Sequence, residues 1–357
     1  MYPFKHSLRW AIPILLIWLL ACKKNNNTPE VTTNYLQTIL TTDMQGLGDA
    51  RPDNNLINAW GLAINPNGLL WIAANATNRT VVYDTNGEQR LPPVTMSEVG
   101  ALGPSEPSGV IFNPTTDFPI FNTNKTAKFI WATESGALQE WADGPNAITV
   151  VDRSNRNLVY KGLAIANNNG SNYLYVTDFR NAKIDVFDNQ WNLVTSVIFN
   201  DPAIPANYGP FNIACFGNKL FVTYAARQGP VNSDDSAGAG NGYVDEYAPD
   251  GTLLKRLASR GALNSPWGLA QVPDKNFGLP FHAILVGNFG DGKINAYDST
   301  GRYLGALRSN GAPITIDGLW ALSFANTITG ADPDKLYFTA GPMDETHGLF
   351  GFLHRTP

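Results

Sequence analysis

The stretch Trp60-Gly61-Leu62-Ala63 decides the fold, because variants of it recur along the chain. The recurrences are Ser108-Gly109-Val110-Ile111, Lys161-Gly162-Leu163-Ala164, Phe211-Asn212-Ile213-Ala214, Trp267-Gly268-Leu269-Ala270 and Asp317-Gly318-Leu319-Trp320. Their second residues are 48, 53, 50, 56 and 50 positions apart. A period of about fifty residues is typical of a β-propeller blade, so six periods predict six blades.

Two further runs follow each anchor and are rich in β-branched and aromatic residues, the composition of strands. In the first repeat they are Leu70-Trp71-Ile72-Ala73 and Val81-Val82-Tyr83-Asp84. The anchor and these two runs give three clear strands, and a weaker fourth completes each blade. The sequence therefore predicts an all-β, six-bladed propeller with four-stranded blades. Lack of a Cβ at the anchor glycine permits close approach where the innermost strands converge.

The last repeat stops soon after its third run, Leu349-Phe350-Gly351-Phe352, and has no fourth strand of its own. The run from Tyr35 to Leu40 precedes the first anchor and has no other partner. We predict that this N-terminal strand joins the last blade and closes the ring, which removes both sheet edges. Residues 35–357 then form a single domain.

The composition agrees with this fold. The chain of 357 residues is 43% hydrophobic and only 15% charged, which excludes a disordered chain. Its 33 glycines and 24 prolines disfavour long helices and helical bundles.

The N-terminus resembles a lipoprotein signal peptide over residues 1–21. Lys5 and Arg9 supply a basic region, and an apolar run from Ala11 to Leu20 is too short to span a bilayer. Leu19-Leu20-Ala21-Cys22 resembles the bacterial lipobox, so we predict lipidation of Cys22 and a flexible tether over residues 22–34. The expected location is the bacterial cell envelope, lipid-anchored at the outer membrane or a periplasm-facing membrane surface. The alternative is an ordinary secretory signal with an incidental cysteine.

Cleavage would reduce Lys+Arg from 25 to 23 against 30 acids and move the formal charge from −5 to −7. Such a surface repels nucleic acid, so no nucleic-acid partner is expected. Only Cys215 remains after lipidation, and its apolar neighbours indicate a small buried hydrophobe. The expected partners are the membrane, through the lipid, and an envelope protein, a peptide or a glycan. The chain is expected to be a monomer.

Several phrases resemble an uncharacterised family of exported bacterial six-bladed propellers. They include Asn58-Ala59-Trp60-Gly61-Leu62-Ala63, Thr177-Asp178-Phe179, Ser265-Pro266-Trp267-Gly268 and Ile316-Asp317-Gly318-Leu319-Trp320. The resemblance covers about residues 35–354 and implies no established activity. Many members carry a sorting tail of the PEP-CTERM type, whereas this chain ends Phe352-Leu353-His354-Arg355-Thr356-Pro357. The architecture is more distantly similar to NHL-repeat and gluconolactonase-like propellers.

Oxygen-bearing side chains provide the candidate ligand site at the central channel. Asn75, Glu134, Asp178 and Asn288 follow the second strands, and the anchors bring Asn58, Lys161, Asn212 and Asp317. Corresponding positions of a propeller cluster around one axis, and carboxylates and amides suit Ca²⁺ or Mg²⁺. The metal-ligand candidates are Asp178, Asn288 and Asp317. The alternative is that these groups satisfy turns and hydrogen bonds between blades.

Other signals for chemistry are sparse. The histidines of the mature chain, His282, His347 and His354, fit no usual zinc spacing, and no nucleophile elbow is present. The segment from Gln228 to Gly242 is a long insertion in the fourth repeat, either a ligand lid or tolerated slack.

Two functions are carried forward. One is a lipid-anchored binding or interaction module of the cell envelope, with an unknown ligand. The other is a lactonase-like hydrolase that depends on Ca²⁺ or Mg²⁺ and has its site at the central channel. No catalytic residue is assigned.

Overall fold

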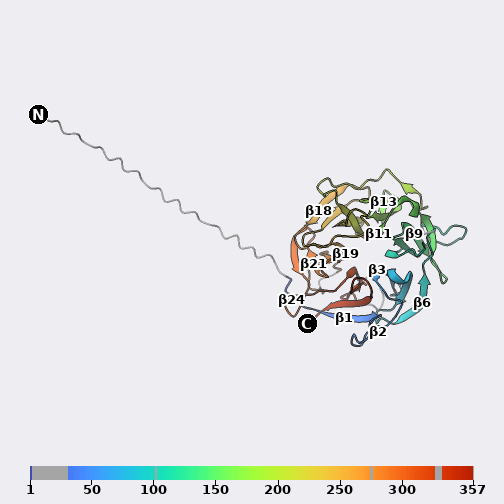
Figure 1. The fold of residues 1–357 in the computed structure, drawn as a ribbon, viewed down its shortest axis with the longest axis horizontal. Helices are drawn as coiled ribbons and strands as arrows, with labels where there is room; N and C mark the ends of the chain where they lie inside the picture. Colours follow the sequence, from blue (N-terminus) through green and yellow to red (C-terminus); the bar gives the residue numbers. More distant parts are fainter. Residues whose placement is uncertain (2–30, 101–102, 274–275, 326–331, 357) are drawn as a thin grey trace.

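The computed structural model describes residue 1 and residues 31–100, 103–273, 276–325 and 332–356 (Figure 1). The predicted signal peptide, Cys22 and most of the tether lie outside these residues. Within the described part of the chain, no helix is long and apolar enough to cross a membrane.

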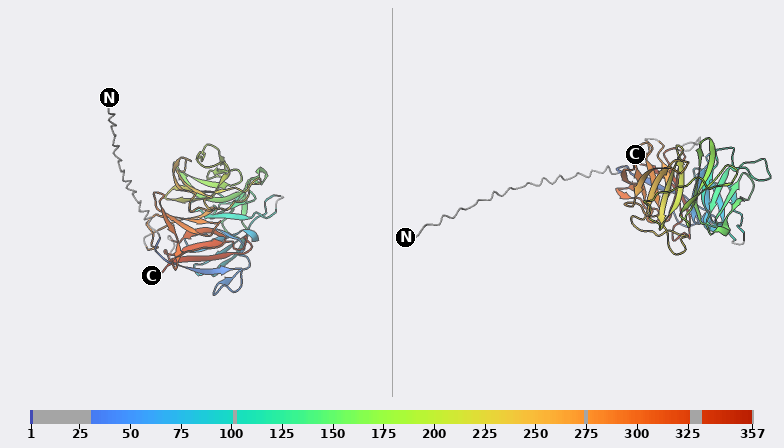
Figure 2. Two further views of the ribbon diagram at one scale, coloured as in Figure 1. Left: turned by 60° about the vertical axis from the view of Figure 1, so that its left-hand side comes forward. Right: turned by 90° about the horizontal axis from the view of Figure 1, so that it is seen from above.

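Six sheets surround a central axis, as the six repeats predict, and their strands are antiparallel except where β2 (Arg51–Pro52) pairs with β1 (Tyr35–Thr42) (Figures 1 and 2). The first blade consists of β3 (Ala59–Ile64), β4 (Leu70–Ala74), β5 (Arg79–Tyr83) and β6 (Gln89–Thr95). The second consists of β7 (Pro107–Phe112), β8 (Phe129–Thr133), β9 (Ala137–Trp141) and β10 (Ile148–Asp152). The third consists of β11 (Tyr160–Asn168), β12 (Ser171–Asp178), β13 (Lys183–Phe187) and β14 (Leu193–Val194). The next two consist of β15 (Tyr208–Phe216), β16 (Lys219–Ala226), β17 (Tyr243–Tyr247) and β18 (Leu253–Ser259), and of β19 (Pro266–Gln271), β20 (Ile284–Asn288), β21 (Ile294–Tyr297) and β22 (Tyr303–Ala306).

The sixth blade contains both ends of the propeller, which confirms the predicted closure. Its strands are β25 (Leu319–Phe324), β26 (Leu336–Ala340), β27 (Leu349–Arg355) and β1 (Tyr35–Thr42), with the short β2 (Arg51–Pro52) at the edge. β1 runs antiparallel to β27, with Tyr35 opposite Arg355 and Thr42 opposite Leu349. The ring is therefore held by backbone hydrogen bonds between segments about 310 residues apart. The remaining short elements are η1 (Asn75–Thr77), η2 (Ser154–Arg156), β23 (Arg308–Ser309) and β24 (Ala312–Pro313).

The core lies between neighbouring blades, because both faces of each sheet are covered. Trp71 of the first blade stacks on Phe129 of the second, with ring centroids 4.0 Å apart. At the anchors the blades approach closely: a Cβ on Gly61 would lie 2.7 Å from the backbone nitrogen of Val110 in the next blade. This contact confirms the predicted role of the anchor glycine, since any larger residue would separate the two inner strands.

The order of strands gives the disc two different faces. The inner strands β3, β7, β11, β15, β19 and β25 begin at one face, where the second strands also end. We call this the polar face, and it carries Asn58, Asn75, Glu134 and Glu345. The opposite face, where the inner strands end and the second strands begin, we call the apolar face.

Candidate functional site

Lys161 is the centre of the polar face. It is the second residue of β11, and only 2% of its surface is exposed. Its Nζ forms an ion pair with Glu134 Oε1, lies 3.8 Å from Asp234 Oδ1, and stands 4.7 Å from the centroid of the Trp60 ring. A buried ammonium group is stable only with such partners, so Lys161 holds carboxylates from two other blades.

Two asparagine side chains extend this network across the first blade. Asn75 Nδ2 donates to Glu134 Oε2 at 2.9 Å, and Asn58 Nδ2 donates to Asn75 Oδ1 at 3.3 Å. Asn58 Nδ2 also donates to Glu345 Oε2 at 2.5 Å. The polar chain therefore runs from the sixth blade through the first and second to Lys161 in the third, and ends at Asp234 in the fourth.

Glu345 is held by an unusual turn between β26 and β27. Met343, Asp344 and Glu345 all have positive φ angles, 56°, 54° and 64°. Left-handed backbone costs a non-glycine residue roughly 1–2 kcal/mol, so the surrounding contacts must hold this turn. Asp317 Oδ2 accepts a hydrogen bond from the Met343 backbone nitrogen at 2.9 Å, and His347 Nδ1 lies 2.7 Å from Asp43 Oδ2.

The polar end of the channel around Lys161, which we call the Lys161 mouth, is crowded with acids, and this crowding determines their protonation. Burial, followed by repulsion from Glu134, raises the pKa of Glu345 to about 7. The same two causes raise the pKa of Glu106, and burial raises the pKa of Asp235. Burial disfavours the charged form of Lys161, but Glu134, Asp234 and Glu345 outweigh it and raise the lysine pKa. Within the part of the chain that the structure describes, the Lys161 cation is therefore surrounded by acids, which are Glu106, Glu134, Asp234, Asp235 and Glu345.

Stacked aromatic rings close the channel beneath this network. Trp60 stacks on Trp320 with centroids 3.9 Å apart, and Phe289 stacks on the same Trp320 at 4.0 Å. Trp267 meets the Trp60 ring edge-on at 6.3 Å. We call these four residues the aromatic plug. Trp320 Nε1 donates to Asn58 Oδ1 at 2.9 Å, which ties the plug to the polar network.

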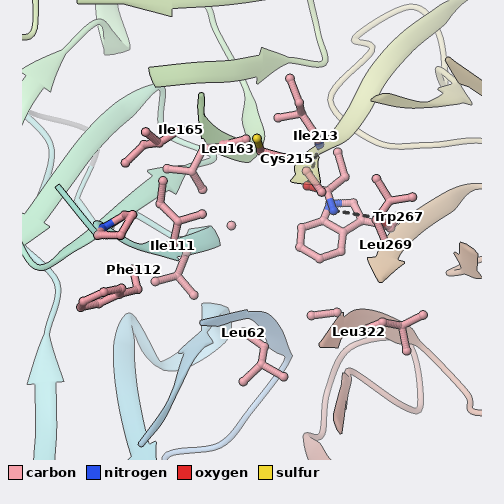
Figure 3. Close-up of a pocket in the computed structure, with 17 residues that line it drawn as sticks. Leu62, Ile111, Phe112, Leu163, Ile165, Ile213, Cys215, Trp267, Leu269 and Leu322 are labelled. Carbon is pink, nitrogen blue, oxygen red and sulfur yellow. Dashed lines mark hydrogen bonds between the residues drawn. The ribbon is translucent and has the colours of Figure 1, made fainter. Parts of the chain in front are cut away.

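Beyond the plug the channel widens into a cavity of about 270 Å³. Figure 3 shows aliphatic side chains from the inner strands around this space, among them Leu62, Ile111, Leu163, Ile213 and Leu322. The polar network and this cavity are thus two separate sites on one axis.

Of the six residues predicted to surround a ligand, two lie in the Lys161 network: Asn75 and Glu134. Asn58 and Lys161, named with them as anchor residues, complete that network. Asp178 is fully buried and engaged locally, since Asn181 Nδ2 donates to its Oδ2 at 2.8 Å.

The other predicted ligands have different surroundings. Asn212 lines the cavity and donates from Nδ2 to the Trp267 carbonyl at 2.8 Å. Asn288 donates from Nδ2 to the Ala262 carbonyl at 2.8 Å and to Asp291 Oδ1 at 2.9 Å. Asp317 is exposed and supports the Glu345 turn. Within the described ranges, no group of three or more His, Cys, Asp or Glu side chains is arranged to hold a metal ion.

Sequence reasoning missed Glu345 and the role of Asp234. Glu345 follows a second strand, as Glu134 does, so the same positional rule could have found it. Asp234 belongs to the insertion between β16 and β17, which folds over the polar face: Gly238 N donates to Asn264 Oδ1 at 2.6 Å, and Ser236 N donates to the Ala226 carbonyl at 2.7 Å.

No family model matches the sequence. The chain is 36% identical over 317 residues to uncharacterized protein R648 of Acanthamoeba polyphaga mimivirus, covering 85% of this chain and 76% of the relative. It is 34% identical over 317 residues to uncharacterized protein L690 of the same virus, with 85% and 82% covered. The chain belongs to the family of these proteins. Because these relatives are viral, they do not support the expected membership of an exported bacterial family.

Solved structures with the same architecture show the fold alone. The GH93 alpha-L-arabinofuranosidase of Fusarium graminearum aligns with a TM-score of 0.58 at 13% identity, covering 90% of this chain and 98% of the enzyme. A streptogramin B lyase aligns with a TM-score of 0.53 at 12% identity, covering 90% and 98%. A protein of unknown function from Bacteroides thetaiotaomicron aligns with a TM-score of 0.56 at 10% identity, covering 90% and 77%.

Proposed function

We propose that this propeller is a lipid-anchored binding module of the cell envelope whose ligand site is the Lys161 mouth of the polar face. One observation carries the proposal: a fully buried lysine joins carboxylates from different blades at the solvent-facing end of the axis. Buried charge is costly, and its concentration at one mouth is typical of a functional site.

The chemistry of the mouth favours a ligand that donates hydrogen bonds. Glu106 and Asp234 are exposed, and Glu345 is half-buried, so their acceptor oxygens are accessible, whereas the cation Lys161 is buried and already paired. A small organic amine or an amino sugar would add the positive charge that this group of acids lacks. An anionic ligand would meet repulsion.

Three sugars of one size test this charge preference. Glucosamine, glucose and glucuronate differ mainly in charge, and calorimetric titration at pH 7 should rank their affinities in that order. Glu345→Gln should reduce glucosamine affinity about tenfold, as expected for a lost charged hydrogen bond of about 1.5 kcal/mol. Glu88→Gln, in an exposed turn on the apolar face, is the matched control and should change nothing. Preference for glucuronate would contradict the proposal.

The anchor is tested separately. Mass spectrometry of the N-terminal peptide from protein expressed in a bacterial host should show acyl chains on Cys22, and Cys22→Ser should release the protein from membranes. An unmodified Cys22 would overturn the anchor without affecting the binding site.

Hydrolysis at the same mouth is a second candidate function. The raised pKa of Glu345, about 7, allows it to carry a proton near neutral pH, while Glu134 faces Lys161. Such a pair can supply a proton donor and a proton acceptor. Gluconolactone hydrolysis measured with and without EDTA distinguishes a metal-dependent reaction from one that uses the carboxyl pair. Loss of activity with EDTA supports the lactonase-like use of Ca²⁺ or Mg²⁺. Activity that survives EDTA but is lost in Glu345→Gln supports the carboxyl pair. If gluconolactone is not hydrolysed under either condition, hydrolysis is rejected and the binding module remains the proposed function.

A further inference from the structure

We propose that the apolar face rests on the surface of a phospholipid bilayer, which directs the Lys161 mouth away from the membrane. The inference deepens the proposed function, since it rests on the lipid anchor, but its evidence comes from residues of the propeller itself. Three observations carry it: the positions of exposed apolar side chains, the point where the N-terminal segment joins the disc, and the pairing of charges on this face.

Large apolar side chains are exposed mainly at the apolar face. At the apolar face they are, with their exposed fractions, Phe121 (56%), Ile148 (53%), Phe281 (52%), Leu36 (49%), Leu254 (47%) and Leu193 (42%). Ile198 (70%) lies in the connection from β14 to β15, which leads towards the polar face. Among the described residues of the polar face, the corresponding set is Val231, Met343 and Leu47. Isolated exposed apolar residues are normal, but an excess on one face marks an interaction surface.

The strand order fixes these positions. Phe121 lies between β7 and β8, and Phe281 lies between β19 and β20, both connections that leave an inner strand at the apolar face. Ile148, Leu193 and Leu254 begin or nearly begin fourth strands, which start at the same face. Aromatic side chains such as Phe121 and Phe281 are suited to shallow insertion among lipid headgroups.

The N-terminal segment joins the propeller at this face. Val31 N donates to the Leu304 carbonyl at 2.8 Å, close to the start of β22. Thr33 Oγ1 donates to the Gly278 carbonyl at 3.2 Å, within the connection that carries Phe281. Val31 lies nine positions after Cys22, and this stretch spans at most about 30 Å when extended. A lipid on Cys22 would therefore keep this face close to the bilayer.

Cations of the apolar face are largely neutralised by neighbouring acids. Lys125 pairs with Asp143 at 2.7 Å, Lys219 pairs with Glu246 at 2.7 Å, and Arg302 pairs with Asp298 at 3.0 Å. Contact with lipid should therefore depend on apolar insertion and not on attraction to anionic headgroups. The paired charges of this face favour a bilayer over a charged protein surface as the occupant.

The test places a fluorophore at either face of the full, lipidated chain. Phe121→Cys and Val231→Cys introduce labelling sites at two similarly exposed apolar residues, 56% and 61%, on opposite faces. Both carry Cys215→Ala, so that the label reacts at one position. The proteins are reconstituted into vesicles of phosphatidylethanolamine and phosphatidylglycerol that contain lipids with spin labels near the headgroup.

The label at position 121 should be quenched at least threefold more than the label at position 231, with little change in 0.5 M NaCl. Replacing Phe281 and Ile148 by serine should reduce quenching at position 121, whereas Val231→Ser with Met343→Ser should leave it unchanged. Equal quenching at both positions, or stronger quenching at 231, would overturn the inference. Protection of position 121 from thiol labelling in native membranes, without quenching in vesicles, would indicate a protein partner. That result would also overturn the inference.

Mass spectrometry detects the acyl group on Cys22 independently of the quenching measurement, so failure of the anchor and failure of the orientation can be distinguished. If the acyl group is absent, the same labels are examined in variants that also carry Cys22→Ser, with the vesicles added in excess, and the comparison of faces still decides the inference.

Discussion

The two ends of the central channel have opposite chemistry although the same six strands form both. At the polar face, Lys161, Glu134 and Glu345 form a connected network of charge, whereas at the other end aliphatic residues such as Ile111 and Leu163 surround an open cavity (Figure 3). The aromatic plug separates them. Each inner strand therefore changes from polar to apolar along its length, and this separation keeps buried charge away from the apolar cavity.

Removing the plug should have the largest effect. Trp320→Ala deletes a buried ring that stacks on Trp60 and Phe289, so the free energy of unfolding should fall by about 4 kcal/mol. Urea denaturation measures the loss. Trp141→Ala, at a partly exposed ring between the first two blades, should cost clearly less. Equal losses would show that the plug contributes no more to stability than an ordinary ring between two blades.

Removing the central cation should come next. Lys161→Met leaves Glu134, Asp234 and Glu345 without their shared partner, and the free energy of unfolding at pH 7 should fall by about 3 kcal/mol. Glu134→Gln in the same background should recover part of the loss, because one of the unpaired charges is gone. A double-mutant cycle by urea denaturation measures this coupling, and additive losses would contradict the network.

The pH dependence of stability should distinguish the polar mouth from the rest of the disc. The pKa of Glu345 is raised from 4.5 to about 7, so the folded state holds the extra proton between these values. Stability should therefore fall as the pH rises from about 4.5 to 7, and Glu345→Gln should remove about 1 kcal/mol of this fall after allowance for solvent screening.

Glu140 is the matched control for this titration. Burial, followed by Asp143, raises its pKa to about 7, and it lies in β9, outside the Lys161 network. Glu140→Gln should flatten the stability profile in the same direction but leave the pH dependence of glucosamine binding unchanged. A change in that binding profile would show that the two regions are coupled.

The smallest effect is expected at the exposed rim of the mouth. The Asp234 side chain is 67% exposed and lies 3.8 Å from Lys161, so Asp234→Asn should change the free energy of unfolding by less than about 0.5 kcal/mol. Glucosamine affinity should nevertheless fall about threefold, because the mouth loses one negative charge. An unchanged affinity, measured by calorimetry, would restrict the ligand site to the other accessible acids, Glu106 and Glu345.

Much of this architecture could be predicted from particular residues. The recurring anchor around Gly61 predicted the blades, and the unpartnered strand from Tyr35 predicted the closure onto β27. The candidate site was harder to predict, because residues after second strands share a face but differ in their local partners. Glu134 meets Lys161, whereas Asp178 turns to Asn181, and no spacing in the sequence distinguishes these outcomes.

The sequence alone determined the repeat, the strand order and therefore which residues lie at each end of the axis, because alternation and period are local properties of the chain. Only the tertiary structure decided that Glu345 and Asp234 reach the same lysine from the sixth and fourth blades. Their approach depends on a left-handed turn and on an insertion folded across the mouth. Such contacts arise from the packing of distant segments, which a one-dimensional pattern does not specify.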